Sequence, residues 1–186
     1  MRRNDKEPVP PGGHSLQENW PLGGDTHEVL TTELEWSILR FYAAFGRSCE
    51  QLSDMAGSSE TSFFELVLLH VIAMQRSPQP IASLARQLNR DDIANLQYGI
   101  RKLCSRDLLQ KAGVSRGKQT TYELTSTGRR LVTEYAALRR ELLTSKTGIV
   151  RDVDQRLADA ARLISLLTGL YDNVAQAGAT YTRLAD

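Results

Sequence analysis

The sequence predicts a mainly α-helical fold with one small β-hairpin, and three features indicate this. The composition is that of an ordinary globular chain, with 41% hydrophobic and 24% charged residues, and helix-favouring Ala, Leu, Arg, Glu and Gln are frequent. Apolar residues recur at steps of three and four in several long segments. Two strand-like segments, 108–112 and 120–124, flank a turn that contains glycine. At 186 residues the chain can form one domain with a sizeable core, or a compact domain with a dimerisation appendage.

The first part of the chain predicts a flexible arm followed by a long helix. Residues 1–28 are rich in proline, glycine and charge, a composition that disfavours a packed core. An apolar stripe with the spacing of one helix face then runs from Leu30 to about Ser53. The stripe consists of Leu30, Leu34, Ile38, Phe41, Phe45 and Leu52. We expect residues 29–56 to form a dimerisation helix.

Three further helices follow, and each has a recognisable start. Ser62 and Glu65 have the spacing of a capping box, and the largely buried helix behind them should end near Gln75. Pro80 opens a short third helix, and the polar run 89–92 breaks it and supplies the N-cap of a fourth. The residues expected to face inward on these two helices are Ile81, Leu84, Ala85 and Leu88, and then Ile93, Leu96, Ile100 and Leu103. Two short helices joined by a polar turn are the outline of a helix-turn-helix.

The second half of the chain predicts a β-wing and two more helices. Residues 113–119 join the two strands as a hairpin tip, and Thr125 can cap a fifth helix behind it. The apolar residues of that helix are Leu131, Val132, Tyr135, Leu138 and Leu142. A last helix, from about Val150 to Gln176, has apolar residues at alternating steps of four and three. These are Val153, Leu157, Ala160, Ile164, Leu167, Tyr171 and Val174. So narrow a stripe indicates a partner helix, either the first helix of the same chain or, as we favour, a second chain.

Positive charge is concentrated in one stretch of the chain. Ten basic and four acidic residues lie between Arg86 and Arg130, although the formal net charge of the whole chain is only +1. A surface that binds phosphates needs such a concentration of charge. An ordinary solvated surface is the alternative.

The polar face of the fourth helix and the hairpin tip carry the candidate DNA contacts. Asn, Gln and Tyr near the N-terminus of a helix can bond base edges, whereas cations further along meet phosphates or solvent. The candidate base contacts are Asn95, Gln97 and Tyr98, and the candidate phosphate contacts are Arg101, Lys102 and Arg106. In the hairpin tip, Arg116 is predicted to enter the minor groove and Lys118 to contact a phosphate.

Two other kinds of site stay open at this stage. Trp36, Arg40 and Tyr42 are candidate lining residues of a pocket for a small-molecule effector, where the first helix meets the DNA-binding lobe. The alternatives are that Trp36 lies in the core or an interface and that Arg40 forms a surface ion pair. For Cys104 we favour a buried structural thiol, and the alternative is redox sensing, because nearby arginines could lower its thiol pKa. Cys49 has no evident partner.

Several classes of protein are not expected. The three histidines lie in the arm or in an apolar helix, and no catalytic spacing or phosphate loop accompanies them, so we predict no enzyme and no catalytic residue. Two cysteines without metal-finger spacing predict neither a metal site nor a disulfide framework, and no cofactor is expected. No apolar run reaches the roughly 18 residues of a membrane span, and the N-terminus does not resemble a secretory signal. We therefore expect a cytoplasmic protein.

The order of these elements resembles the MarR family of winged-helix regulators over roughly residues 30–176. Three segments carry the resemblance: Ile81–Leu88 (IASLARQL), Ile100–Leu109 (IRKLCSRDLL) and Tyr122–Gly128 (YELTSTG). Asp107 stands where the family usually has glycine, and Asn-Leu-Gln-Tyr at 95–98 replaces the usual Ser/Thr-Arg pattern. The resemblance implies a winged helix-turn-helix flanked by dimerisation helices, with DNA often released when a small molecule binds.

The sequence thus predicts a homodimeric transcription regulator that binds pseudo-palindromic double-stranded DNA, acts as a repressor and is released by an effector. A winged-helix module that binds proteins without specific DNA binding is the alternative. The predicted segments are a flexible N-terminal arm (1–28), a dimerisation helix (29–56), a winged helix-turn-helix DNA-binding domain (57–145), and a C-terminal dimerisation helix with a tail (146–186).

Overall fold

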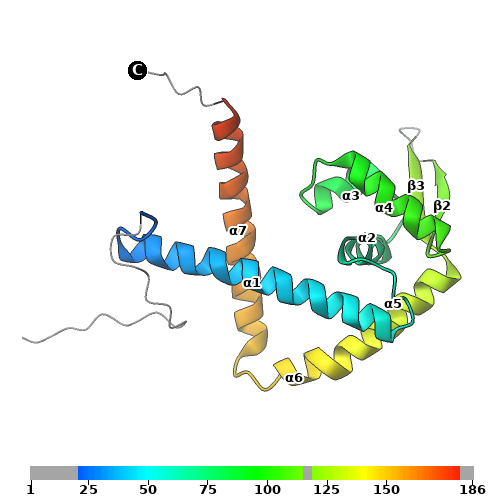
Figure 1. Ribbon diagram of the computed structural model, residues 1–186, viewed down its shortest axis with the longest axis horizontal. Helices are drawn as coiled ribbons and strands as arrows, with labels where there is room; N and C mark the ends of the chain where they lie inside the picture. The colour runs from blue at the N-terminus through cyan, green and yellow to red at the C-terminus, as the bar shows by residue number, and fades with distance from the viewer. Residues whose placement is uncertain (1–20, 115–118, 181–186) are drawn as a thin grey trace, which may run out of the picture. The chain divides into compact units, whose positions relative to one another are not determined.

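A computed structural model of the chain describes residues 21–114 and 119–180, which fall into two compact units that divide after Tyr135. Most elements are helices, as predicted (Figure 1). In chain order they are α1 (Thr26–Met55), α2 (Phe63–Ala73), β1 (Gln79–Pro80), α3 (Ile81–Gln87), α4 (Ile93–Ser105), β2 (Leu109–Val114), β3 (Thr120–Leu124), α5 (Ser126–Arg139), a π-helical segment (Arg140–Thr144), α6 (Ser145–Thr147) and α7 (Val153–Thr180). The mainly α fold with a small hairpin is confirmed.

Short polar side chains set the starts of the first two helices. The Asp25 carboxylate accepts a hydrogen bond of 2.9 Å from the main-chain N–H of Glu28 and caps α1. At α2 the predicted capping box is present. The Glu65 N–H donates to Ser62 Oγ at 3.4 Å, and the Ser62 N–H donates to Glu65 Oε2 at 3.2 Å. Both bonds satisfy donors that the first helical turn leaves open.

The core of the N-terminal unit lies where α2, α3, α4 and the hairpin meet, beside the C-terminal end of α1 (Figure 1). Its largest fully buried side chains are Leu66, Leu68, Leu69, Leu84, Leu96, Ile100, Leu103 and Leu109. Burial of each such side chain contributes about 1.5–3 kcal/mol before the loss of entropy is counted. The inward orientation predicted for Leu96, Ile100 and Leu103 is confirmed. That predicted for Ile93 is wrong, since its side chain is 39% exposed at the first residue of α4.

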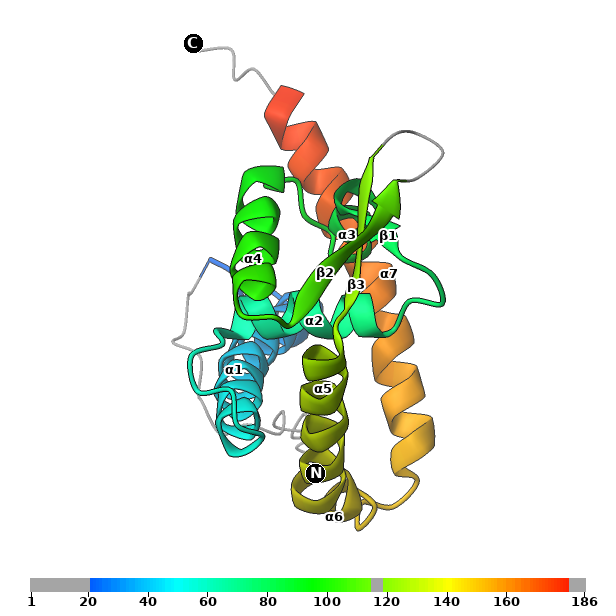
Figure 2. The same cartoon turned by 90° about the vertical axis from the view of Figure 1, so that its right-hand side faces the viewer.

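The hairpin pairs with a third strand that the sequence analysis did not predict. The sheet order is β1-β3-β2, with antiparallel pairs throughout. The register between β2 and β3 shifts between Lys111 and Gly113, which marks a bulge. Figure 2 shows β2 and β3 side by side, extending next to α4. Residues 115–118 at the tip lie outside the described residues, and with them the predicted DNA contacts Arg116 and Lys118.

The joint between α4, the hairpin and α5 explains why the sequence has an aspartate at position 107 and a glycine at position 128. Asp107 has a φ of 57°, in the left-handed region where glycine is most at ease and Asp is tolerated. Its main-chain oxygen accepts from Thr125 Oγ1 at 2.5 Å and its carboxylate accepts from Thr127 Oγ1 at 2.9 Å, so this Asp holds the turn as well as forming it. At Gly128 a Cβ atom would lie 2.1 Å from the carbonyl oxygen of Leu108, so only glycine fits there.

The predicted cap of α5 is confirmed, and the predicted length of its apolar face is not. Thr125 Oγ1 accepts the N–H of Gly128 at 3.0 Å, and Leu131 and Tyr135 are buried. Leu142 was expected on the same face, but it lies in the π-helical segment and is 38% exposed. A π-turn shifts the phase of a helix, so the side chains behind it leave the face that precedes it.

The C-terminal unit is dominated by α7, which begins at Val153 and continues beyond the predicted end to Thr180. Of its described side chains, residues 153–179, none is buried. Four residues of the predicted seam are largely exposed, namely Leu157, Ile164, Tyr171 and Val174. No helix in the described part of the chain is long and apolar enough to cross a membrane.

Candidate nucleic-acid interface

The N-terminal half of α4 presents the three predicted base contacts to solvent. Asn95 and Gln97 are exposed, and the Tyr98 side chain is 56% exposed. On the opposite face Leu96 and Ile100 are buried in the core. Helical spacing separates the two sets because residues three and four apart share a face. This half of α4 is therefore held rigidly by one side and open on the other.

Asn95 belongs to a polar network at the start of α4. Its Nδ2 donates to Asp92 Oδ2 at 3.2 Å, and Arg90 Nε donates to Asp92 Oδ1 at 2.7 Å, beside a second bond from the Arg90 guanidinium. The Arg90 guanidinium also lies 4.8 Å from the centre of the Phe64 ring. Asp92 occupies the N-cap position, as predicted, but its side chain bonds Arg90 and Asn95 and no main-chain N–H. The network thus limits the orientations of the Asn95 amide.

The hydrogen bond from Arg90 holds the pKa of Asp92 at about 2, below its usual 3.8, and the bond from Asn95 acts in the same direction. The same pairing raises the pKa of Arg90. Because the folded-state pKa of Asp92 is lowered, the contribution of the network is present above the unfolded pKa and is lost as the pH falls through about 2. The network is therefore fully charged at neutral pH.

The C-terminal half of α4 directs two of its cations to a carboxylate of the chain itself. Lys102 Nζ lies 2.5 Å from Glu65 Oε1, and Arg106 Nη1 lies 3.1 Å from Glu65 Oε2. Glu65 is only 3% exposed, so these pairs join α4 to α2. The sequence pattern predicted only a capping role for Glu65. A single acid within an otherwise apolar helix was the available signal that it also needed cationic partners.

Gln97 lies at a groove between α4, the start of α3 and the N-terminal part of β3. The groove has a volume of about 350 Å³. It is lined by Ile81, Ala82, Ile93, Gln97, Gln119, Thr120 and Tyr122. The exposure of Ile93 follows from its place in this lining. The described part of the hairpin adds Lys111, which is exposed on β2.

The three effector candidates lie on α1 but do not form one cluster. Trp36 is 47% and Tyr42 60% exposed. Arg40 is exposed, and its Nη2 donates to Ser37 Oγ at 3.0 Å. Trp36 and Arg40 are one helical turn apart, whereas Tyr42 is two residues beyond Arg40 and contacts the Phe63 ring edge-on, with the ring centres 5.4 Å apart.

The two thiols are placed in different surroundings. Burial raises the pKa of Cys104, and Lys111 offsets this in part, which favours the structural thiol over the redox sensor. Cys49 does have a partner, because Tyr135 Oη donates to its Sγ at 3.2 Å, and the Tyr135 ring packs 4.4 Å from the ring of His70. A raised pKa disfavours the reactive thiolate at Cys104. Within residues 21–114 and 119–180 there is no group of three or more His, Cys, Asp or Glu that could hold a metal ion.

Comparison with known proteins assigns this interface to a family of domains. Residues 64–128 match the winged helix DNA-binding domain family. A search of curated proteins found no relative of the chain. Among solved structures, MarR of Staphylococcus aureus in complex with salicylate and kanamycin has a TM-score of 0.61 at 17% identity, over 76% of this chain and 94% of that one.

Two further structures agree with this fold. A MarR family transcriptional regulator from Silicibacter pomeroyi has a TM-score of 0.61 at 17% identity, over 82% of this chain and 99% of that one. The transcriptional regulator BldR from Sulfolobus solfataricus has a TM-score of 0.59 at 16% identity, over 73% and 94%. Residues 64–128 are therefore a winged-helix DNA-binding domain, and the described chain has the fold of MarR-family regulators, as the resemblance implied.

Proposed function

We propose that this protein is a sequence-specific regulator of transcription that binds double-stranded DNA as a homodimer. The observation that carries the proposal is the open N-terminal half of α4, on which Asn95 and Tyr98 are exposed within a winged-helix DNA-binding domain. In such domains this helix enters the major groove, and residues near its N-terminus contact base edges. Transcription in bacteria takes place in the cytoplasm, which is where we propose that the protein acts.

Asn95, Gln97 and Tyr98 are proposed to contact the bases or the DNA strand beside them. An Asn amide can bond adenine through both its oxygen and its nitrogen, and a Tyr ring can contact a thymine methyl group. The Asp92 bond supports this role for Asn95, because an oriented amide loses less freedom on binding. Gln97 lies at the groove beside the hairpin, where the strand between the major and minor grooves would pass.

Arg101 is the phosphate contact that the geometry of α4 favours. It is exposed, and it forms no ion pair with the described residues. Lys102 and Arg106 can reach a phosphate only in competition with Glu65, so we propose that they act mainly by holding α4 in place. Arg116 and Lys118 in the hairpin tip stay proposed minor-groove and phosphate contacts, supported by their sequence alone.

The exposed apolar faces of α1 and α7 support a homodimer. Phe41 on α1 is 67% exposed and Leu157 on α7 is 58% exposed, and neither stands alone on its helix. Extended apolar surface of this kind marks an interface more often than open solvent. A two-fold dimer would place two copies of α4 in successive major grooves, about 34 Å apart, on a pseudo-palindromic site.

Repression by steric exclusion of polymerase, relieved by a small molecule, completes the proposal. The S. aureus structure with this fold holds salicylate and kanamycin, which makes both compounds reasonable first effectors to test. Trp36, Arg40 and Tyr42 are the residues of this chain proposed to meet such an effector. Their exposure is compatible with this role.

Selection of bound fragments from random duplex DNA tests the function directly. We expect a two-fold symmetric consensus, and we expect Asn95→Ala to reduce the preference for that consensus over random DNA by about tenfold or more, since a bidentate base contact is worth about 1–3 kcal/mol. Gln155→Ala, an exposed amide on α7, is the matched control and should change nothing. Selection without a consensus, together with protein partners lost in Asn95→Ala, would favour the protein-interaction module instead.

A further inference from the structure

The start of α4 holds the Asn95 amide through two bonds to a single residue. The main-chain N–H of Asn95 donates to the carbonyl oxygen of Asp92 at 3.0 Å, and its Nδ2 donates to Asp92 Oδ2 at 3.2 Å. The reverse orientation of the amide would place its oxygen against a carboxylate oxygen, and two acceptors form no hydrogen bond. The carboxylate therefore fixes which side of the amide carries the donor and which carries the acceptor.

The amide held in this way keeps one N–H and one oxygen for a partner. An Asn side chain has two N–H donors, and Asp92 accepts one of them. In the major groove adenine presents an acceptor, N7, beside a donor, N6, which match the remaining N–H and the oxygen. Guanine presents two acceptors there, cytosine one donor and thymine one acceptor, so each leaves one atom of the amide without a partner. Of the four bases, adenine alone satisfies both.

The Asp92 carboxylate has donors on both oxygens and is not available to contact a base itself. Arg90 Nε donates to Oδ1 at 2.7 Å, and Arg90 Nη2 donates to Oδ2, the oxygen that also accepts from Asn95. A carboxylate without these donors could bond cytosine N4. A guanidinium on both oxygens also reduces the repulsion between this carboxylate and the phosphates of DNA. Arg90 therefore keeps Asp92 in place for Asn95 and makes its charge acceptable at the interface.

Arg90 is in turn held against the core. Its guanidinium lies 4.8 Å from the centre of the Phe64 ring on α2. Phe64 packs against the core cluster, and a Cβ atom at Gly99 of α4 would lie 3.2 Å from this ring, so the ring has little room to move between the two helices. A chain of contacts thus leads from the core through Arg90 and Asp92 to the Asn95 amide.

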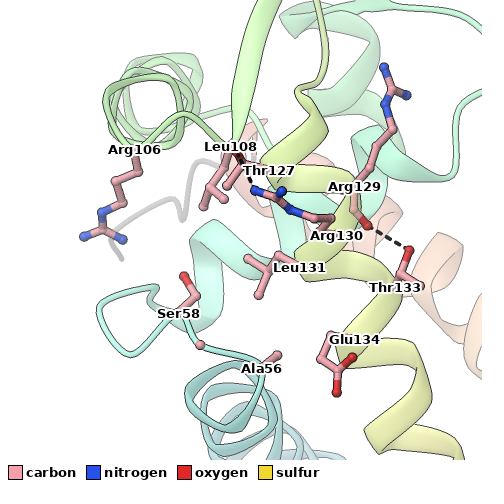
Figure 3. A pocket seen from close by; sticks show the side chains of 11 residues that line it. Ala56, Ser58, Arg106, Leu108, Thr127, Arg129, Arg130, Leu131, Thr133 and Glu134 are labelled. Atoms are coloured by element: carbon pink, nitrogen blue, oxygen red, sulfur yellow. Dashed lines mark hydrogen bonds between the residues drawn. The ribbon is translucent and has the colours of Figure 1, made fainter.

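The opposite end of α4 is fixed by separate contacts. Figure 3 shows Arg106 beside this end of the helix, together with the pocket that it borders. Its Nη1 pairs with the buried Glu65 of α2 at 3.1 Å. Neither Arg90 nor Asp92 nor Asn95 belongs to the lining of that pocket. With both ends of α4 anchored on α2, the orientation of the Asn95 amide depends on the contacts at its own end.

We propose that Arg90, acting through Asp92, orients the Asn95 amide so that it selects an adenine in each half-site of the operator. The inference rests on the proposed function, and it adds the identity of one base and two positioning residues that do not touch that base. Without Arg90 the carboxylate is free to rotate away and the amide to turn over, so the preference for adenine falls. An Arg90 that bonded a phosphate would instead strengthen binding to every sequence equally.

Competition between two duplexes tests the proposal with the full chain. One duplex is the selected operator, and the other has guanine in place of adenine, in one half-site, at the position where Asn95→Ala loses its base preference. We expect Arg90→Gln to reduce the ratio of the two affinities about threefold to tenfold, the factor that one hydrogen bond contributes. Arg86→Gln removes the same charge from an exposed position on α3 and should leave the ratio unchanged. In the Asn95→Ala chain, Arg90→Gln should have no further effect on the ratio.

Three results would overturn the proposal. The first is a base other than adenine at the position that depends on Asn95. The second is an Arg90→Gln effect on the ratio that is as large in the Asn95→Ala chain as in the native one, since Arg90 would then act independently of the amide. The third is an unchanged ratio with a smaller dependence of affinity on salt, which would make Arg90 a phosphate contact.

NMR relaxation of the Asn95 side-chain amide tests the orientation in the absence of DNA. We expect this amide to be as ordered in Arg86→Gln as in the native chain, and more mobile in Arg90→Gln. Equal order in all three chains would overturn the positioning role of Arg90. Absence of specific DNA binding by the native chain would overturn the proposed function and the choice of adenine, and the relaxation result would still decide whether Arg90 orients the amide.

Discussion

Helices α4 and α7 have similar apolar spacing in sequence and very different surroundings in the structure. In α4 the apolar residues Leu96 and Leu103 are fully buried against α2, α3 and the hairpin. In α7 the corresponding residues Leu157 and Val174 are 58% and 70% exposed. An amphipathic pattern therefore indicates that a helix needs a partner surface. It does not indicate whether the same chain provides that surface. We propose that α4, which the core holds by one face, contacts DNA, and that α7, whose apolar residues are exposed, binds a second copy of the chain.

The largest expected effect comes from a charge in the exposed seam of α7. Ile164→Glu should prevent dimerisation and reduce operator affinity by about a hundredfold or more, because each half-site then has to bind independently. Ser165→Glu adds the same charge at the next residue, outside the seam, and should remain dimeric. Light scattering on each variant as it elutes from a size-exclusion column measures its molar mass and so its oligomeric state. A dimeric Ile164→Glu variant would place the dimer interface elsewhere.

The two faces of α4 should separate stability from DNA binding. Leu103→Ala should reduce the free energy of unfolding by about 2–5 kcal/mol, since it leaves a cavity in the core. Tyr98→Ala, on the 56% exposed face, should change that free energy by less than about 0.5 kcal/mol and yet weaken binding to the selected operator. Urea denaturation and operator binding, measured on both variants, provide the comparison. Equal losses of stability would mean that Tyr98 is part of the core in solution.

The ion pairs of Glu65 should contribute less to the free energy of unfolding than the apolar core beside them. Glu65→Gln is expected to reduce the free energy of unfolding by about 1–3 kcal/mol, because a buried group loses two cationic partners. This loss is smaller than the loss expected when a fully buried ion pair is broken, since Lys102 and Arg106 remain partly in contact with water. Glu60→Gln, which removes an 87% exposed acid 3.9 Å from Arg106, is the control and should have little effect.

The smallest effect is a change in the salt dependence of operator binding. Arg101→Gln should reduce the slope of log affinity against log salt by about 0.9 per protomer, the value of one phosphate contact on duplex DNA. Lys102→Gln should leave the slope nearly unchanged if the Lys102 ammonium group stays paired with Glu65 in the complex with DNA. If Lys102→Gln reduced the slope as much as Arg101→Gln, Lys102 would be a phosphate contact in the complex with DNA.

Local sequence signals predicted the features that depend on neighbouring residues. The capping box at Ser62, the cap at Thr125 and the inward residues of α4 all follow from spacings within one or two helical turns. β1 was missed because two residues, one of them proline, carry no strand pattern, and it forms only through pairing with β3. The Glu65 pairs were missed for the same reason, since Lys102 and Arg106 lie about 40 residues away in the chain. Of the candidate site, the exposed face of α4 could be predicted from periodicity, but the division of its cations between solvent and Glu65 could not.

The tight joint at Gly128 gives the molecule a mechanical property. Because a single added methyl group would collide with the Leu108 carbonyl, the first turn of α5 and the segment that leaves α4 have no room to slide past each other. Asp107 bonds the same turn through its main chain and its carboxylate. We expect this contact to act as a stiff coupling, so that a tilt of the first turn of α5 is transmitted to the C-terminal end of α4.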